Sequence, residues 1–283
     1  MLVSFIITLR EGMEAALIIG IIAAYLAKIG RRDLNKFLYI GTASALIASI
    51  VVAFIFKGLY GGFEGKAEKL FEGVVMLFAA TVLTYMIFWM SRQAYLIKGE
   101  LQEKIDFAIS SRHLFGIASI AFLSVFREGV ETVLFLGTLA MISPADTLIG
   151  FFGGLVSVIV LGVLLLKGTY RLDYRKFFIY TSTILIFFAS GLTAQGVHEL
   201  QEANVLPVFV EHLWDINPAL NPDGSYPPMH EKGIIGSTMK SLFGYNGDPS
   251  LLEAFSYLIY WLIVGLYVFK INEKGRLQPI NKK

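Results

Sequence analysis

Long apolar runs recur along the chain and predict a bundle of membrane-spanning helices. A run of about 20 apolar residues is long enough to cross the hydrocarbon core of a bilayer as an α-helix. We expect seven spans, at residues 2–27, 37–56, 71–91, 114–141, 147–166, 177–199 and 250–270. The first run lacks a basic leading segment and a small-residue cleavage site, so we expect it to be retained as a helix.

The composition agrees with an integral membrane protein. Of the 283 residues, 55% are hydrophobic and 16% are charged, whereas a soluble domain has about 25% charged residues. Cysteine is absent, which excludes disulfides, iron–sulfur clusters and cysteine nucleophiles. A Gly-rich phosphate-binding loop is also missing, so we do not expect this chain alone to drive transport with ATP.

One short charged motif interrupts both the first and the fourth apolar run. Residues 10–14 read Arg-Glu-Gly-Met-Glu and residues 127–131 read Arg-Glu-Gly-Val-Glu. An ionisable side chain at the bilayer centre costs about 2.5–3.5 kcal/mol on insertion scales. Residues three and four apart share a helix face, so each motif gathers its three charges on one side. The central glycine of each motif leaves room for another backbone or an ion to approach closely.

The two motifs together suggest a cation site. Their charged side chains are Glu11, Glu14, Glu128 and Glu131, with Arg10 and Arg127 as charge partners. Four carboxylates exceed two guanidiniums, and carboxylate oxygens suit hard, multiply charged cations. We expect Glu14 and Glu131 to bind the ion directly, with the other two glutamates as further ligands or as partners of the arginines. The alternative interpretation is that each motif is a self-neutralising salt bridge that joins two helices.

The spacing of the motifs predicts an inverted repeat. Three spans separate the starts of the two motif helices, so these helices run in opposite directions across the membrane. We therefore expect an all-α integral membrane protein with seven transmembrane helices, built from two inverted three-helix repeats plus a seventh helix. As one membrane domain over 1–283, it divides into repeat one at about 1–97, repeat two at about 113–202, an external loop at about 203–249 and a final helix at about 250–270. Transporters of this kind bind substrate near the midplane where the repeats meet.

The basic residues predict the orientation. Seventeen Lys and Arg residues follow spans one, three, five and seven, whereas five lie in the alternate loops. Loops rich in Lys and Arg face the cytoplasm. The N-terminus is therefore expected outside and the C-terminus in the cytoplasm, with the protein in the plasma membrane.

Acidic side chains also gather at the expected outer ends of spans three and six. The candidates for an ion entrance are Glu64, Glu68, Glu72, His198, Glu199 and Glu202. Their spacing places the members of each group on one helix face, where they could concentrate cations, and His with carboxylate suits iron and similar divalent metals. The alternative for Glu64, Glu68 and Glu72 is an ordinary solvated helix face on which Lys66 and Lys69 are their ion-pair partners. We expect the long connection 203–249 to form an ordered cap over the pore mouth, without regular secondary structure.

With both motifs identified, the chain resembles the high-affinity iron permease family, also called oxidase-dependent iron transporters. The hallmark of that family is a paired Arg-Glu-x-x-Glu motif in the first and fourth transmembrane helices. Residues 196–202 and 242–253 also look like prokaryotic members. The resemblance implies iron uptake across the plasma membrane, with the paired glutamates as ligands and iron as a substrate, with no tightly bound cofactor. It further implies an extracytoplasmic ferroxidase or iron-delivery protein as a partner, and it leaves Fe(II) and Fe(III) both open.

Other functions make different demands on the sequence. A transporter of another divalent cation, such as manganese or lead, would use the same carboxylates. A seven-helix receptor shares the orientation, but a retinal pigment needs a lysine inside its last helix, and residues 251–269 contain none. The spans hold no Ser/His, paired-Asp or His-Glu-x-x-His arrangement, so we do not expect an enzyme. Nothing in the sequence points to nucleic acid.

Overall fold

The computed structural model describes residues 1–93, 97–110, 115–166 and 173–277. In these ranges the regular secondary structure is entirely helical, which confirms the all-α prediction. The helices are α1 (Leu2–Lys28), the 3-10 helix η1 (Arg32–Leu34), α2 (Asn35–Tyr60), α3 (Lys66–Gln93), α4 (Ile97–Ser110), α5 (Phe115–Ile142), α6 (Pro144–Leu166), α7 (Tyr174–Glu202), α8 (Ile234–Phe243) and α9 (Leu251–Leu277).

Five of these helices are long and apolar enough to cross a membrane: α2, α3, α6, α7 and α9. The other two expected spans, 2–27 and 114–141, coincide with α1 and α5. These two helices carry the charged motifs in their middle, so their composition alone does not qualify them as spans. Seven spans therefore stay a prediction.

The chain divides into two compact units. Unit one comprises residues 1–64 and 81–186, which hold α1, α2, α4, α5, α6 and parts of α3 and α7. Unit two comprises residues 65–80 and 187–283, which hold the remaining parts of α3 and α7 together with α8 and α9.

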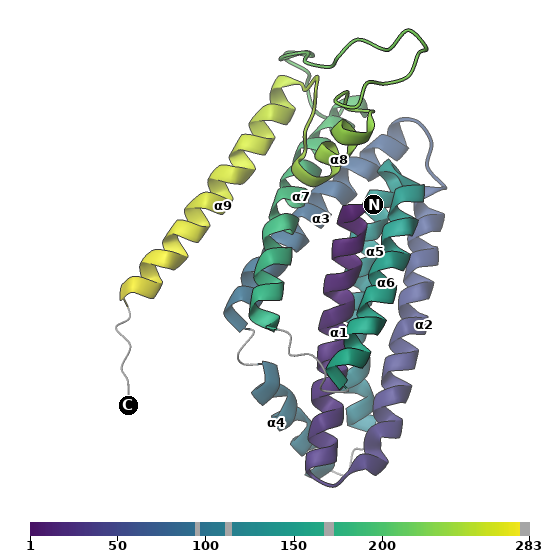
Figure 1. The fold of residues 1–283 in the computed structure, drawn as a ribbon, viewed down its shortest axis with the longest axis vertical. Helices are drawn as coiled ribbons and strands as arrows, with labels where there is room; N and C mark the ends of the chain where they lie inside the picture. Colours follow the sequence, from purple (N-terminus) through teal and green to yellow (C-terminus); the bar gives the residue numbers. More distant parts are fainter. Residues whose placement is uncertain (94–96, 111–114, 167–172, 278–283) are drawn as a thin grey trace. The chain divides into compact units, whose positions relative to one another are not determined.

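In unit one, α1 packs along α6 through small residues (Figure 1). The contacting pairs are Ser4 with Gly150, Thr8 with Gly154, and Gly12 with Val158. Residue numbers rise together along the two helices, so α1 and α6 are parallel. Small residues at the contact allow the two backbones to approach closely, as is typical of membrane helices.

The same pattern joins α2 to α5. The contacting pairs are Gly41 with Ala118, Ser49 with Gly129, and Phe56 with Gly137. The numbers again rise together, so α2 and α5 are parallel. In Figure 1, α1 leads into α2 at the lower end of the view, so α1 and α2 run in opposite directions. The two motif helices, α1 and α5, are therefore antiparallel, as their spacing predicts.

The connection 92–113, which looks like an ordinary basic loop in the sequence, contains the helix α4. Its Leu101, Ile105 and Ala108 are buried in one cluster with residues of α1 and α5, among them Ile22 and Ile117. These three residues follow the apolar spacing of an amphipathic helix, a signal that the many charges of this segment obscured. The expected start of repeat two at 113 and most of the basic connection 167–176 lie outside the described residues.

In unit two, the segment 203–249 is tied to the start of α9. Leu213 N donates to Pro249 O at 2.9 Å, Ile216 N donates to Gly247 O at 2.9 Å, and Leu251 N donates to Val210 O at 3.1 Å. The expectation that this segment lacks regular structure was wrong, because it contains α8. That helix is capped by Gly244, which has the left-handed φ of 69° typical of the residue after a helix and packs against Gly191 of α7.

Candidate metal centre

The two charged motifs lie in the middle of α1 and α5, inside unit one. The side chains of Arg10, Glu11, Glu14 and Glu128 are buried. Glu131 is 14% exposed and Arg127 is 43% exposed. Charged side chains enclosed to this degree need partners, because burial of an unpaired charge is strongly unfavourable.

Each arginine pairs with both glutamates of its own motif. Arg10 Nη1 lies 3.0 Å from Glu11 Oε1. Arg10 Nη2 lies 3.1 Å from Glu14 Oε1, close enough for an ion pair although the two atoms are not aligned for a hydrogen bond. The planar guanidinium therefore bridges two carboxylates one helical turn apart, as a fork-shaped cation can.

Arg127 makes the corresponding contacts on α5. Its Nη2 and Nε atoms donate to Glu128 Oε1 at 2.6 and 3.0 Å. Its Nε lies 3.5 Å from Glu131 Oε1. The guanidinium also lies over the ring of Trp89 in α3, with its central carbon 5.2 Å from the ring centroid.

Three carboxylates from the two motifs converge on one place. One oxygen each of Glu11, Glu128 and Glu131 lies within 4.8 Å of the other two. On each of these glutamates, Oε2 is buried and has no hydrogen-bond partner in the described part of the chain. Buried polar atoms are normally satisfied, and one cation could satisfy all three. This donor set of hard oxygens fits a divalent or trivalent metal ion. Glu14 is not part of the three-carboxylate group.

The motif glycines contribute to helix packing. A Cβ atom added to Gly12 would lie 2.6 Å from Val158 Cγ2 of α6, and one added to Gly129 would collide with Ser49 of α2. The sequence predicts that another backbone or an ion approaches each motif glycine closely. In the structure a neighbouring helix does so, α6 at Gly12 and α2 at Gly129.

The predicted entrance residues behave in two ways. In unit two, Lys69 binds three of them: its Nζ lies 2.8 Å from Glu199 Oε2, 3.1 Å from Glu202 Oε2 and 3.4 Å from Glu72 Oε2. His198 extends this group, with Nε2 3.2 Å from Glu202 Oε1. We call these five residues the Lys69 cluster.

The other two predicted residues do not join the cluster. Glu64 is exposed and Glu68 is half-buried, and neither has an ion-pair partner among the described residues. Of the two lysines expected as partners on a solvated face, Lys69 pairs with Glu72, and among the described residues it pairs with neither Glu64 nor Glu68.

Sequence reasoning missed Glu253 of α9, which lies against the Lys69 cluster. Glu253 Oε1 lies 3.0 Å from His198 Nδ1, and its side chain is buried. A local signal was present, because Ser250 and Glu253 form a capping box in which Ser250 N donates to Glu253 Oε1 at 3.1 Å. The spacing of these residues predicts a helix start, but it carries no information about the distant His198.

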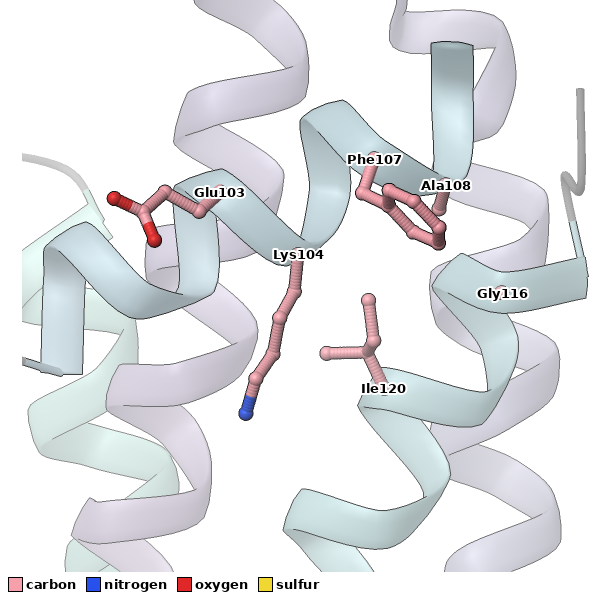
Figure 2. A pocket seen from close by; sticks show the side chains of 6 residues that line it. All are labelled: Glu103, Lys104, Phe107, Ala108, Gly116 and Ile120. Carbon is pink, nitrogen blue, oxygen red and sulfur yellow. The ribbon is translucent and has the colours of Figure 1, made fainter. Parts of the chain in front are cut away.

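A separate pocket opens between α4 and the start of α5 (Figure 2). Phe107, Ala108, Gly116 and Ile120 make it largely apolar, with Glu103 and Lys104 at one side. None of the motif residues lines it, so it is not part of the candidate metal centre.

Comparisons with known proteins agree with this centre. Residues 1–276 match the sequence profile of the iron permease FTR1 family. An uncharacterised protein of Archaeoglobus fulgidus is 39% identical over 88% of this chain and 87% of its own length. The ferrous iron permeases EfeU of Escherichia coli O157:H7 and of Yersinia pestis are each 33% identical, over 97% and 95% of this chain and 97% and 93% of their own lengths.

No solved structure was found to match the chain. The family and the names of the relatives point to a transporter rather than an enzyme. The match to the family profile covers almost the whole sequence and includes both charged motifs. The chain therefore belongs to the iron permease FTR1 family, as a membrane-embedded iron uptake permease.

Proposed function

We propose that the permease binds its iron ion between α1 and α5, with Glu11, Glu128 and Glu131 as direct ligands. The observation that carries this proposal is the convergence of their oxygens within 4.8 Å, in a buried place where three Oε2 atoms have no partner among the described residues. In this assignment Glu14 holds Arg10, and Glu11, which also pairs with Arg10 through Oε1, offers its unpartnered Oε2 atom to the ion.

The charge balance supports a multivalent substrate. Four carboxylates and two guanidiniums leave a formal charge of −2, which one divalent ion would neutralise. An ion that gives up its hydration shell in a low-dielectric site needs charged ligands to compensate it. A monovalent ion would leave the buried centre negatively charged.

Ferrous iron is the substrate that we propose. The relatives named ferrous iron permease support this choice. Carboxylate oxygens would also accept Fe(III), and they discriminate poorly among hard divalent ions such as manganese. Because the ligands alone do not separate Fe(II) from Fe(III) or Mn(II), measurements of transport must distinguish these substrates.

We propose two inverted three-helix repeats and a seventh helix as the architecture, with α1, α2 and α3 in repeat one, α5, α6 and α7 in repeat two, and α9 last. The helix pairs of unit one support it, because exchanging the two repeats converts the parallel pair α1 and α6 into the parallel pair α5 and α2. Inverted repeats also place corresponding helices antiparallel, as α1 and α5 are. Substrate sites at such interfaces lie near the bilayer midplane.

We propose a plasma-membrane location with the N-terminus outside and the C-terminus in the cytoplasm, supported by the uneven distribution of Lys and Arg. In that orientation the Lys69 cluster faces the outside, where its carboxylates would concentrate cations. An extracytoplasmic ferroxidase or iron-delivery protein would then supply the ion.

Uptake into proteoliposomes tests the proposed substrate and site together. Fe(II), kept reduced, Fe(III) as a soluble chelate, and Mn(II) are supplied separately to wild-type protein, Glu131→Gln and the matched control Glu103→Gln, which changes an exposed glutamate outside the motifs. We expect Fe(II) uptake by wild type and Glu103→Gln and none by Glu131→Gln. Equal uptake by Glu131→Gln would refute the site, and faster uptake of Mn(II) or Fe(III) would refute the substrate.

A further inference from the structure

The two motif arginines have the same sequence context but different surroundings. The Arg10 side chain is fully buried, and among the described residues it has no aromatic partner. The Arg127 side chain is 43% exposed and lies over the face of Trp89. Only Arg127 therefore combines room to move with a second partner for its charge.

Arg127 also occupies two of the three proposed iron ligands. It donates twice to Glu128 Oε1, and its Nε lies 3.5 Å from Glu131 Oε1. An ion bound by the unpartnered Oε2 atoms of the same two carboxylates would neutralise the negative charge that holds the guanidinium. A guanidinium that loses its carboxylates in a half-buried place is destabilised unless another group compensates its charge.

We propose that Trp89 is a positioning residue of the iron centre: its ring face holds the Arg127 guanidinium when Glu128 and Glu131 turn to the ion. This inference rests on the proposed function. A cation over an indole face is stabilised electrostatically, and more strongly when it is partly desolvated. Arg10 keeps its place meanwhile, because it is enclosed and remains paired with Glu14. The two motifs then have different roles, with a fixed arginine on α1 and a movable one on α5.

Removal of the ring face should weaken iron binding while the transport machinery stays in place. We expect Trp89→Leu and Trp89→Met to raise the half-saturating Fe(II) concentration for uptake about 10-fold, the effect of losing a partly desolvated cation–π contact. The rate at saturating iron should stay close to that of wild type. Tyr85→Leu is the control, since Tyr85 lies one turn earlier on α3 and is exposed.

Variants that keep a ring separate this role from simple space filling. Trp89→Tyr and Trp89→Phe retain a weaker π face, so we expect a rise of only about two- to three-fold. An unchanged half-saturating concentration in the leucine and methionine variants would overturn the inference. An equal shift in all four variants would also overturn it, because side-chain volume would then be the cause.

The measurements are made on the full-length protein in proteoliposomes, with membrane abundance measured for every variant. If the leucine and methionine variants do not insert, Trp89→Phe still tests the inference. An unchanged half-saturating Fe(II) concentration in Trp89→Phe would then overturn it. Wild-type uptake in the same experiment tests the proposed function separately. A wild-type protein that transports Fe(II), with Trp89 variants that match it, would refute the inference alone.

Discussion

Arg10 Nη1 lies 3.0 Å from Glu11 Oε1, in a pair whose two side chains are both almost completely buried. This relationship ties the charge of the proposed ligand Glu11 to a guanidinium that solvent does not reach. Replacing Arg10 alone leaves the buried carboxylates of Glu11 and Glu14 without their guanidinium, which is far less favourable than replacing a balanced pair.

Neutralising a proposed ligand should abolish transport. Glu128→Gln and Glu131→Gln keep the shape of the side chain but remove the charge that a dehydrated multivalent ion requires. We expect Fe(II) uptake to fall to the level of empty vesicles, while immunoblotting shows normal membrane abundance. Normal uptake by either variant would mean that the residue is not a ligand.

Arginine at position 10 should not be replaceable by lysine. The two terminal nitrogens of Arg10 reach Glu11 and Glu14 separately, and a single ammonium cannot reproduce this fork. We expect Arg10→Lys to reduce uptake several-fold although the formal charge is kept.

The interpretation of the motif as a structural salt bridge makes a different prediction for position 10. It predicts that Arg10→Leu combined with Glu14→Leu, which removes a balanced pair, leaves transport intact. Uptake and membrane abundance measured on both variants distinguish the two interpretations. Full activity in the double-leucine variant would refute the roles proposed for Arg10 and Glu14, whereas the three proposed ligands are tested by their own glutamine variants.

The Lys69 cluster should affect uptake most at low iron concentration. Glu202→Gln removes a half-exposed carboxylate from the cluster, so the steering of cations should weaken and the defect should shrink at high iron or with added salt. Glu68→Gln is the matched control, since Glu68 is on the same helix as Lys69 but has no ion pair among the described residues. Loss of uptake at every iron concentration in Glu202→Gln would instead make Glu202 part of the central site.

Close packing of α2 on α5 should make Gly41 intolerant of a side chain. A Cβ atom at Gly41 would collide with the carbonyl oxygen of Ala118, whereas one at Gly20 meets nothing within 4 Å. We expect Gly41→Ala to destabilise the protein by about 1–3 kcal/mol, as overpacking typically does. Gly20→Ala should be neutral or mildly stabilising. Thermal unfolding of both variants in detergent tests this, and equal melting temperatures would contradict the packing.

The segment 203–249 should be more firmly ordered at lower pH. Asp248 accepts a hydrogen bond from His212 Nδ1 at 2.8 Å, which raises the pKa of His212 above its ordinary value of 6.5, with the nearby Glu211 and Asp215 adding to the effect. A raised folded-state pKa stabilises the segment fully below the unfolded value, and this contribution is lost as pH rises through the folded value.

Hydrogen exchange of residues 210–216 measures this effect. We expect slower exchange, after correction for the intrinsic rate, at pH 6 than at pH 8.5, and no such difference in His212→Gln. A pH difference that survives in His212→Gln would assign the effect to another group.

Much of this protein was readable from its sequence because membrane helices carry strong local signals. Apolar runs of bilayer length predicted the long helices, and two charged motifs inside such runs predicted where the chemistry lies. The family followed from the same residues. Two segments were misread, at α4 and α8, because their apolar faces are short and lie among charged or turn-forming residues.

Only the tertiary structure decided which of these residues meet. The two motifs are nearly identical in sequence, yet Arg10 is enclosed and Arg127 lies half-exposed over Trp89, a residue 38 positions earlier in the chain. The grouping of Glu11 with Glu128 and Glu131, and of Lys69 with Glu199, likewise joins side chains from different helices. Helical periodicity determines which face of its own helix a side chain occupies. Which faces meet depends on how the helices pack, and that is a property of the folded chain.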